Sequence, residues 1–211
     1  MRIMKPLVLV LTAALVPAAQ GAAQTCLGSN SFANGRMALG VQGGFSSGAK
    51  RFGAIGAYGA PKSWYADVTV GSTSYDAAGS KSVVDFGGSL GYQFGLGDSP
   101  AELCPYAFVG YSSSSGVKTT NYGFGGSIGW RADLSDDVNI VPAVALQWHG
   151  VNTSIDVAGA SISGSGSNVE YGANVGFIFN KQWAIVPGVI QSSASGAKAM
   201  FTVTLAYFWG K

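Results

Sequence analysis

The chain has 211 residues, with 12 basic and 10 acidic side chains, and only 10% of its residues are charged. A typical soluble domain carries about 25% charged residues, so this chain is too poor in charge to coat the outside of a soluble barrel. Arg2 and Lys5 lie in the predicted signal peptide described below, and the rest of the chain has a net charge close to zero. A net charge close to zero does not favour binding to nucleic acid.

The first 23 residues have the pattern of a secretory signal peptide, with a basic start at Arg2 and Lys5 and an apolar core at residues 7–16. We predict cleavage after Ala23, with Gly21 as the alternative. The apolar core is about half of the roughly 20 residues that a membrane-spanning helix needs. The sequence therefore predicts an exported protein that does not cross a membrane with helices.

Large apolar residues alternate with glycine, serine or polar residues in many short stretches, most clearly between Val84 and Phe94 and between Tyr122 and Trp130. A period of two indicates strands with two chemically different faces. Here the large residues form one face, and glycine, serine, alanine and asparagine form the other. Apolar residues outside and small polar residues inside are the arrangement of a transmembrane β-barrel.

Turn-forming clusters divide residues 36–211 into ten strands of a closed, antiparallel, up-and-down, all-β barrel. Tight turns alternate with longer loops, the longest being Asn152–Ser167. Short turns are expected on the periplasmic side and longer loops outside the cell. Pro142 and Pro187 fall inside predicted strands, where each removes a ladder hydrogen bond. β-Bulges at these prolines, or an eight-stranded barrel with one hairpin misassigned, are the alternatives. The predicted strands are 36–46, 51–59, 64–74, 82–94, 105–114, 120–132, 138–150, 168–180, 183–193 and 199–209.

Aromatic residues gather at the predicted strand ends, as expected for rings that prefer the headgroup level on both sides of a membrane. The alternative is the general enrichment of aromatic residues in strands. Among the tryptophans, the predicted girdle consists of Trp64, Trp130 and Trp183 at the periplasmic end and Trp148 at the other end.

The two cysteines lie on the periplasmic side in this topology. Cys26 belongs to a predicted N-terminal arm at residues 24–35, and Cys104 lies at the turn between two predicted strands. Because an exported protein meets an oxidising compartment, we predict a disulfide between them, with two unpaired thiols as the alternative.

The exported start, the alternating strands and the last strand resemble the small bacterial outer-membrane β-barrel proteins of the OmpA-like, OmpX-like and OmpW-like kind. The resemblance implies a location in the bacterial outer membrane and insertion by the barrel-assembly machinery, which reads the last strand. The chain departs from the family in having Gly210 and Lys211 after Trp209, where the family usually ends on Phe or Trp. We expect a monomer without a peptidoglycan-binding domain. The predicted assembly signal comprises Phe201, Val203, Leu205, Tyr207 and Trp209.

Residue parity places five charged or titratable side chains in the lumen, where they must pair with one another or with water. Arg131 is the predicted hub. We interpret the group as an ion network that plugs the lumen, and a gate or a polar solute pathway is the alternative. The five residues are Asp67, Asp85, Arg131, His149 and Glu170.

His149 is the only histidine, and a catalytic role would require a nucleophile and an orienting acid nearby. Lipid-A deacylases pair a histidine with a serine two residues later, but here position 151 is valine. One histidine without a ligand cluster also fails to indicate a metal site. The sequence therefore predicts no catalytic residue, no metal and no cofactor.

Basic residues in the predicted outer loops would meet the anionic phosphates of lipopolysaccharide in outer-membrane lipid. Ordinary solvated loop charges are the alternative. This predicted rim contains Lys50, Arg51, Lys81, Lys118 and Lys198.

The leading functional hypothesis is a non-enzymatic barrel that stabilises the envelope or contacts the surroundings through its outer loops. The second hypothesis is a channel or transporter for a small or apolar solute, and the third is a lipid-A-modifying enzyme.

Overall fold

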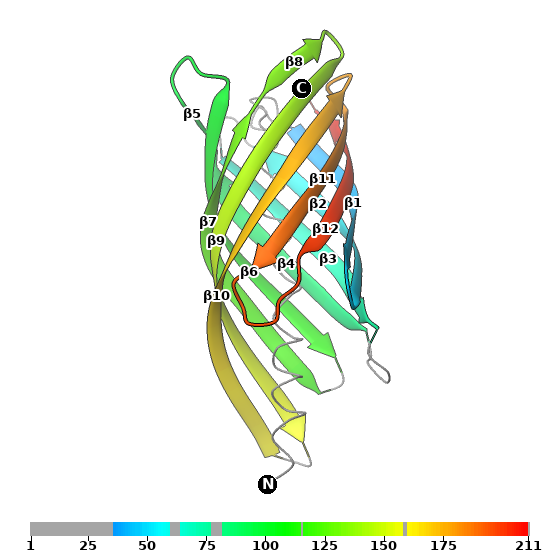
Figure 1. The fold of residues 1–211 in the computed structure, drawn as a ribbon, viewed down its shortest axis with the longest axis vertical. Helices are drawn as coiled ribbons and strands as arrows, with labels where there is room; N and C mark the ends of the chain where they lie inside the picture. Colours follow the sequence, from blue (N-terminus) through cyan, green and yellow to red (C-terminus); the bar gives the residue numbers. More distant parts are fainter. Residues whose placement is uncertain (1–35, 60–63, 77–81, 115, 158–159, 211) are drawn as a thin grey trace.

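The computed structural model describes residues 36–59, 64–76, 82–114, 116–157 and 160–210. Ten long strands pair antiparallel with their neighbours in chain order, and β12 pairs with β1, so the sheet closes into a barrel (Figure 1). This closure confirms the ten-stranded, up-and-down barrel and makes the eight-stranded alternative wrong. The strands of the ring are β1 Arg36–Ser46, β2 Ala49–Gly59, β3 Trp64–Tyr75, β4 Val83–Tyr92, β6 Ala101–Ser114, β7 Val117–Trp130, β9 Val138–Val157, β10 Ala160–Phe179, β11 Trp183–Ser192 and β12 Met200–Trp209.

Two short strands, β5 Phe94–Gly95 and β8 Ala132–Ser135, lie outside this ring. β5 pairs with β6 in the register that β4 has already set, after a gap that faces Pro105. β8 resumes the pairing of β7 with β9 in the same way, after a gap that faces Pro142. Each short strand thus continues the ladder of its predecessor beyond a proline. Within the described ranges, we find no helix with the length and apolar character needed to cross a bilayer.

Pro187 interrupts the ladder between β10 and β11 in the same manner. Pairing stops after Asn174–Gly188 and resumes at Phe177–Ile185 with no change of register. Proline has no N–H to donate, so the neighbouring strand loses a hydrogen bond at that point. The ladder therefore has a short gap opposite each of these prolines, and beyond the gap at Pro142 the β8–β9 ladder also shifts register between Asp133 and Ser135.

The β9–β10 hairpin differs most from the sequence prediction. Both strands have 20 residues and stay paired as far as Val157–Ala160, so the expected loop Asn152–Ser167 is wrong. In Figure 1 this hairpin reaches well beyond the other strands at the end opposite the tight turns. The serine- and glycine-rich composition indicated a loop, but serine recurs at every second position, which is the period of a strand.

The two faces of the barrel have opposite polarity. Large apolar side chains face outward, among them Leu39, Phe124 and Phe201, which are 60%, 64% and 66% exposed. Buried polar side chains such as Gln42, Thr204 and Asn121 face the lumen. The outward placement of the large residues confirms the transmembrane type of barrel, because a soluble barrel would need charged residues on that face.

Candidate functional site

The lumen contains one fully buried ion pair between strands that are not neighbours. Arg51 on β2 donates through Nη2 to Oδ2 of Asp85 on β4 over 2.5 Å, and both side chains are 2% exposed. Gly71, on the intervening β3, makes this contact possible, because a Cβ atom there would lie 2.7 Å from Nη2 of Arg51. The guanidinium therefore crosses β3 over a position without a side chain.

The position of Arg51 corrects its predicted place on the outer rim. We predicted that the second strand begins at residue 51, whereas β2 begins at Ala49, directly after a turn at residues 47–48. Arg51 consequently lies within the strand at an inward position, between the outward residues Lys50 and Phe52. It occupies the lumen as the partner of an acid, which is the role that we predicted for Arg131.

Arg131 lies elsewhere, in the gap between β7 and β8 at the tight-turn end. Its Nε atom is 3.2 Å from Oδ1 of Asp133, and its Nη2 donates to Oδ1 of Asn139 over 3.2 Å. Its side chain is 30% exposed. The predicted hub is therefore wrong: Arg131 follows Ser127 and Gly129 in the inward series, but beyond the ladder gap opposite Pro142 its ion pair is with Asp133 at the end of the barrel.

A second polar group in the lumen joins β6, β9 and β10. Tyr106 donates through its hydroxyl to Oε1 of Gln147 over 2.8 Å, and Gln147 donates through Nε2 to Oε2 of Glu170 over 3.1 Å. The same Glu170 oxygen is 3.4 Å from Nε2 of His149. The ring of Phe108 packs against the imidazole at 4.7 Å between centroids. Four side chains thus form one connected, buried network around Glu170.

Asp67 on β3 is also buried in the lumen and accepts a hydrogen bond from the hydroxyl of Ser89 on β4. The structure therefore places Asp67, Asp85, His149 and Glu170 inside the barrel, in three separate polar groups.

A cluster of apolar side chains lies in the lumen near the tight-turn end, which is the end that carries the turns β2–β3, β8–β9 and β10–β11. It draws buried side chains from seven strands, including Tyr65 on β3, Val141 on β9, Val186 on β11 and Phe208 on β12. Val141 and Val186 are 0% exposed. Both side chains are therefore shielded from water. We did not predict this cluster from the sequence, although Val141, Val186 and Phe208 are large apolar residues at positions whose parity is inward.

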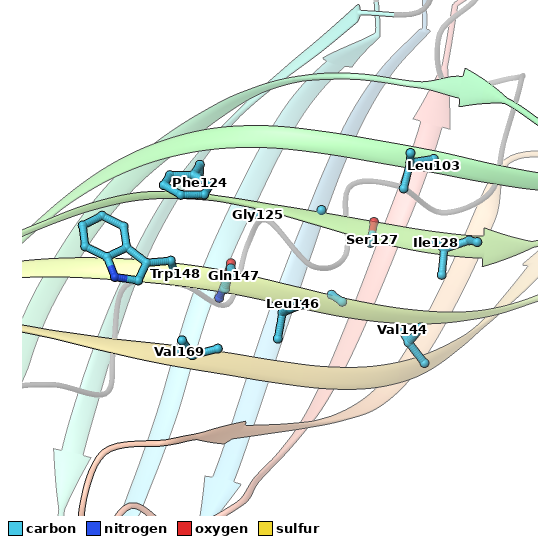
Figure 2. Close-up of a pocket in the computed structure, with 12 residues that line it drawn as sticks. Leu103, Phe124, Gly125, Ser127, Ile128, Val144, Leu146, Gln147, Trp148 and Val169 are labelled. Carbon is cyan, nitrogen blue, oxygen red and sulfur yellow. The ribbon is translucent and has the colours of Figure 1, made fainter.

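The outer wall over β6, β7, β9 and β10 is apolar and hollowed. A depression of about 510 Å³ on this wall is lined by Phe124, Leu146 and Trp148, among others, and Figure 2 shows how these side chains lie on β7 and β9. Gly126 is the one outward position on β7 between Phe124 and Ile128, and its lack of a side chain leaves space between these large residues. Such a surface suits contact with lipid chains.

The predicted tryptophan girdle lies on the outer surface. Trp64, Trp130 and Trp183 are 41%, 58% and 47% exposed. Trp148 packs edge-on against Tyr122, with 6.1 Å between the ring centroids.

The predicted assembly strand is β12, which pairs with both β11 and β1 and so closes the ring. Tyr207 contacts Trp183 and stacks on Trp209. The outward residues of β12 are Phe201, Val203, Leu205, Tyr207 and Trp209.

The remaining rim lysines lie at the loop end. Lys118 Nζ is 3.4 Å from Oδ2 of Asp156, Lys198 donates to the carbonyl of Ser47 over 3.2 Å, and Lys50 is exposed. Lys81, Ala23 and Cys26 lie outside the described residues, so the cleavage site and the bond between Cys26 and the buried Cys104 stay predictions. Within the described part of the chain, no three His, Cys, Asp or Glu side chains converge to hold a metal ion.

No protein-family model matches this sequence, and no curated protein matches it. The β domain of the Bordetella autotransporter BrkA superposes with a TM-score of 0.53 at 14% identity, over 85% of this chain and 100% of that chain. The KdgM porin in complex with disordered oligogalacturonate gives a TM-score of 0.45 at 11% identity, over 81% and 98% of the two chains. The N-terminal β-barrel domain of Pseudomonas aeruginosa OprF gives 0.44 at 9% identity, over 83% and 98%.

The likeness to the BrkA domain concerns the fold alone. Together with the apolar outer wall and the polar residues inside, the closed antiparallel ring defines the class of the protein. The chain is a small transmembrane β-barrel of the kind found in bacterial outer membranes.

Proposed function

We propose that this barrel resides in the bacterial outer membrane, keeps its lumen closed and acts through its outer surface, without enzymatic activity. The observation that carries the proposal is the apolar cluster in which Val141, Ala184 and Val186 have 0% exposure. A water-filled channel would have to pass these side chains. The Arg51–Asp85 pair and the network around Glu170 add further side chains to the same lumen.

Burial of His149 supports the non-enzymatic role. The imidazole is 4% exposed and lies between the Phe108 ring and Glu170. A general base must come within hydrogen-bond reach of a substrate proton, and this packing leaves no room for a substrate beside the ring. A structural role for His149 agrees with the predicted plug.

Ion conductance in planar lipid bilayers tests the closed lumen. We expect the refolded protein to give no steady single-channel current above the leak of the bilayer. The positive control is a variant in which Val141 and Val186 are both replaced by glycine, which removes the largest side chains with no exposed surface from the apolar cluster. This variant is expected to show measurable current steps.

Steady current steps from the unmodified protein would overturn the closed-lumen proposal and favour solute transport instead. Migration on a gel before and after boiling establishes in parallel that the protein has folded, because a closed barrel resists unfolding by detergent until it is heated. Insertion into vesicles with resistance to added protease tests the membrane location separately.

A further inference from the structure

The extended β9–β10 hairpin carries polar residues on its outward face, and the proposed closed lumen does not explain them. Beyond the apolar wall, the outward positions of β6, β7, β9 and β10 hold hydroxyl, amide and a few charged groups. We call this surface the serine face. The register of the four strands places Tyr111, Thr120, Asn152 and Ser165 side by side in one row. The next row toward the hairpin tip holds Ser113, Lys118, Ser154 and Ser163.

Serine occupies every outward position along one edge of this face. On β10, Ser161, Ser163, Ser165 and Ser167 are all exposed, and isoleucine and glycine fill the inward positions between them. Hydroxyl groups both donate and accept hydrogen bonds. The arrangement offers a regular array of small hydrogen-bonding groups on a strand that is paired with β9.

The serine face is concave. A depression of about 510 Å³ is lined by Tyr111, Lys118, Asn152 and Ser165, among others. Tyr111 is held in place by Phe86, with 5.2 Å between the ring centroids. The depression therefore has an aromatic wall, an amide, a row of hydroxyls and an ammonium group.

The face continues directly into the lipid-facing wall. The row that follows it toward the tight turns holds Val109 and Tyr122, and the row after that holds Phe124 and Trp148. A ligand seated in the depression would extend onto an apolar surface. This continuity fits an amphipathic molecule of the membrane and not a free sugar.

The height of the serine face along the membrane normal indicates which class of lipid headgroup is large enough to cover it. Outward residues on one strand are about 6.8 Å apart, so the four serines cover about 20 Å along β10. With a strand tilt of about 40°, this corresponds to about 15 Å of height. The headgroup layer of an ordinary bilayer is only about 5–8 Å thick on each side, so a phospholipid headgroup would leave much of the face uncovered.

We propose that the serine face binds the phosphorylated saccharide headgroup of an outer-leaflet glycolipid. Sugar hydroxyls bond to Asn152 and to the serines of β10, and Lys118 contacts a phosphate. The Lys118–Asp156 pair is exposed and contributes little by itself, so a phosphate can replace the carboxylate. The inference rests on the proposed outer-membrane location and specifies the partner of the outer surface.

Titration of the full-length protein in detergent with purified lipopolysaccharide, followed by calorimetry, tests the proposal. We expect the variant Lys118→Ala/Asn152→Ala to bind at least tenfold more weakly than the unmodified protein. The control Lys181→Ala, which removes an exposed lysine from the β10–β11 turn at the opposite end of the barrel, is expected to stay within twofold. Asp156→Asn is expected to bind more tightly, because it removes the competitor for Lys118.

Hydroxyl contacts are tested by Ser163→Val/Ser165→Val against the control Ser74→Val, an exposed outward serine near the loop end of β3. We expect only the β10 variant to lose affinity. Glycolipid stripped of phosphate is expected to bind more weakly, and inorganic phosphate alone is expected not to displace the glycolipid. Displacement by phosphate alone would overturn the saccharide assignment.

Equal affinity of the unmodified protein, the Lys118→Ala/Asn152→Ala variant and the β10 variant would overturn the proposal while leaving the membrane barrel intact. Failure of the unmodified protein to insert into vesicles would instead overturn the proposed function. All the substituted side chains lie at the surface, and unchanged migration of unboiled samples shows that each variant has kept the barrel.

Discussion

Replacing Arg51 with alanine is expected to lower the free energy of unfolding by about 3–5 kcal/mol, the usual cost of leaving one member of a buried ion pair alone. Asp85 would stay in the lumen with 2% of its side chain exposed and without its cation. Urea titration of the protein folded in lipid vesicles, followed by tryptophan fluorescence, measures this change. The shift should also be visible as a lower temperature at which the unboiled form disappears from a gel.

Two variants separate the ion pair from other effects of the Arg51 substitution. Lys50→Ala changes the neighbouring residue, whose side chain is exposed, and is expected to alter stability by less than about 0.5 kcal/mol. Arg51→Met/Asp85→Leu removes both charges and is expected to recover most of the loss, since apolar replacement of a buried pair is often neutral. A loss in Arg51→Ala no larger than that in Lys50→Ala would contradict the importance of the pair.

Substituting Gly91 with alanine is expected to destabilise the barrel by about 1–3 kcal/mol through overpacking. A Cβ atom at this position would lie 2.4 Å from the ring of Tyr65 and 2.8 Å from the carbonyl oxygen of Pro105. Tyr65 is 1% exposed and belongs to the apolar cluster, so its ring has little space to move. The same unfolding titration measures the loss.

Gly166→Ala is the matched control, because a Cβ atom at Gly166 would meet nothing within 4 Å. Its stability is expected to change by less than about 0.5 kcal/mol. Combining Gly91→Ala with Tyr65→Leu should reveal a favourable coupling of about 0.5–3 kcal/mol, since the two substitutions share one contact. Strict additivity of the two single changes would show that the Tyr65 ring is not what excludes a side chain at position 91.

Strand boundaries could be predicted closely where large and small residues alternate, as in β4 and β7. The prediction failed where the outward face changes from large apolar residues to serine and asparagine, as in the β9–β10 hairpin. Serine and glycine favour turns, and only the pairing of Asn152 with Ser165 and of its neighbours shows that the two segments form a ladder. Local propensity is weak there, and cross-strand hydrogen bonding decides the structure.

Candidate lumen residues could be predicted by parity only as far as the strand starts were correct. Asp67, Asp85, His149 and Glu170 lie inside as expected, whereas Arg51 lies in the lumen and not on the rim, and Arg131 lies at the tight-turn end. The strand start two residues earlier than predicted placed Arg51 within the ladder, and the gap opposite Pro142 placed Arg131 at the end of its inward series. Parity identifies a face, but it does not indicate which side chains meet across the barrel.

The amino-acid sequence was sufficient to predict a β-barrel whose outer wall faces lipid. Charge scarcity and the two-residue period are local properties, and they are sufficient to decide which face of each strand meets lipid. The tertiary structure was needed to show that buried apolar side chains from seven strands meet inside the barrel, that Arg51 reaches Asp85 over Gly71, and that a serine-rich segment forms a polar face on a paired strand. These features depend on contacts between residues far apart in the chain, which become neighbours only when the ring closes.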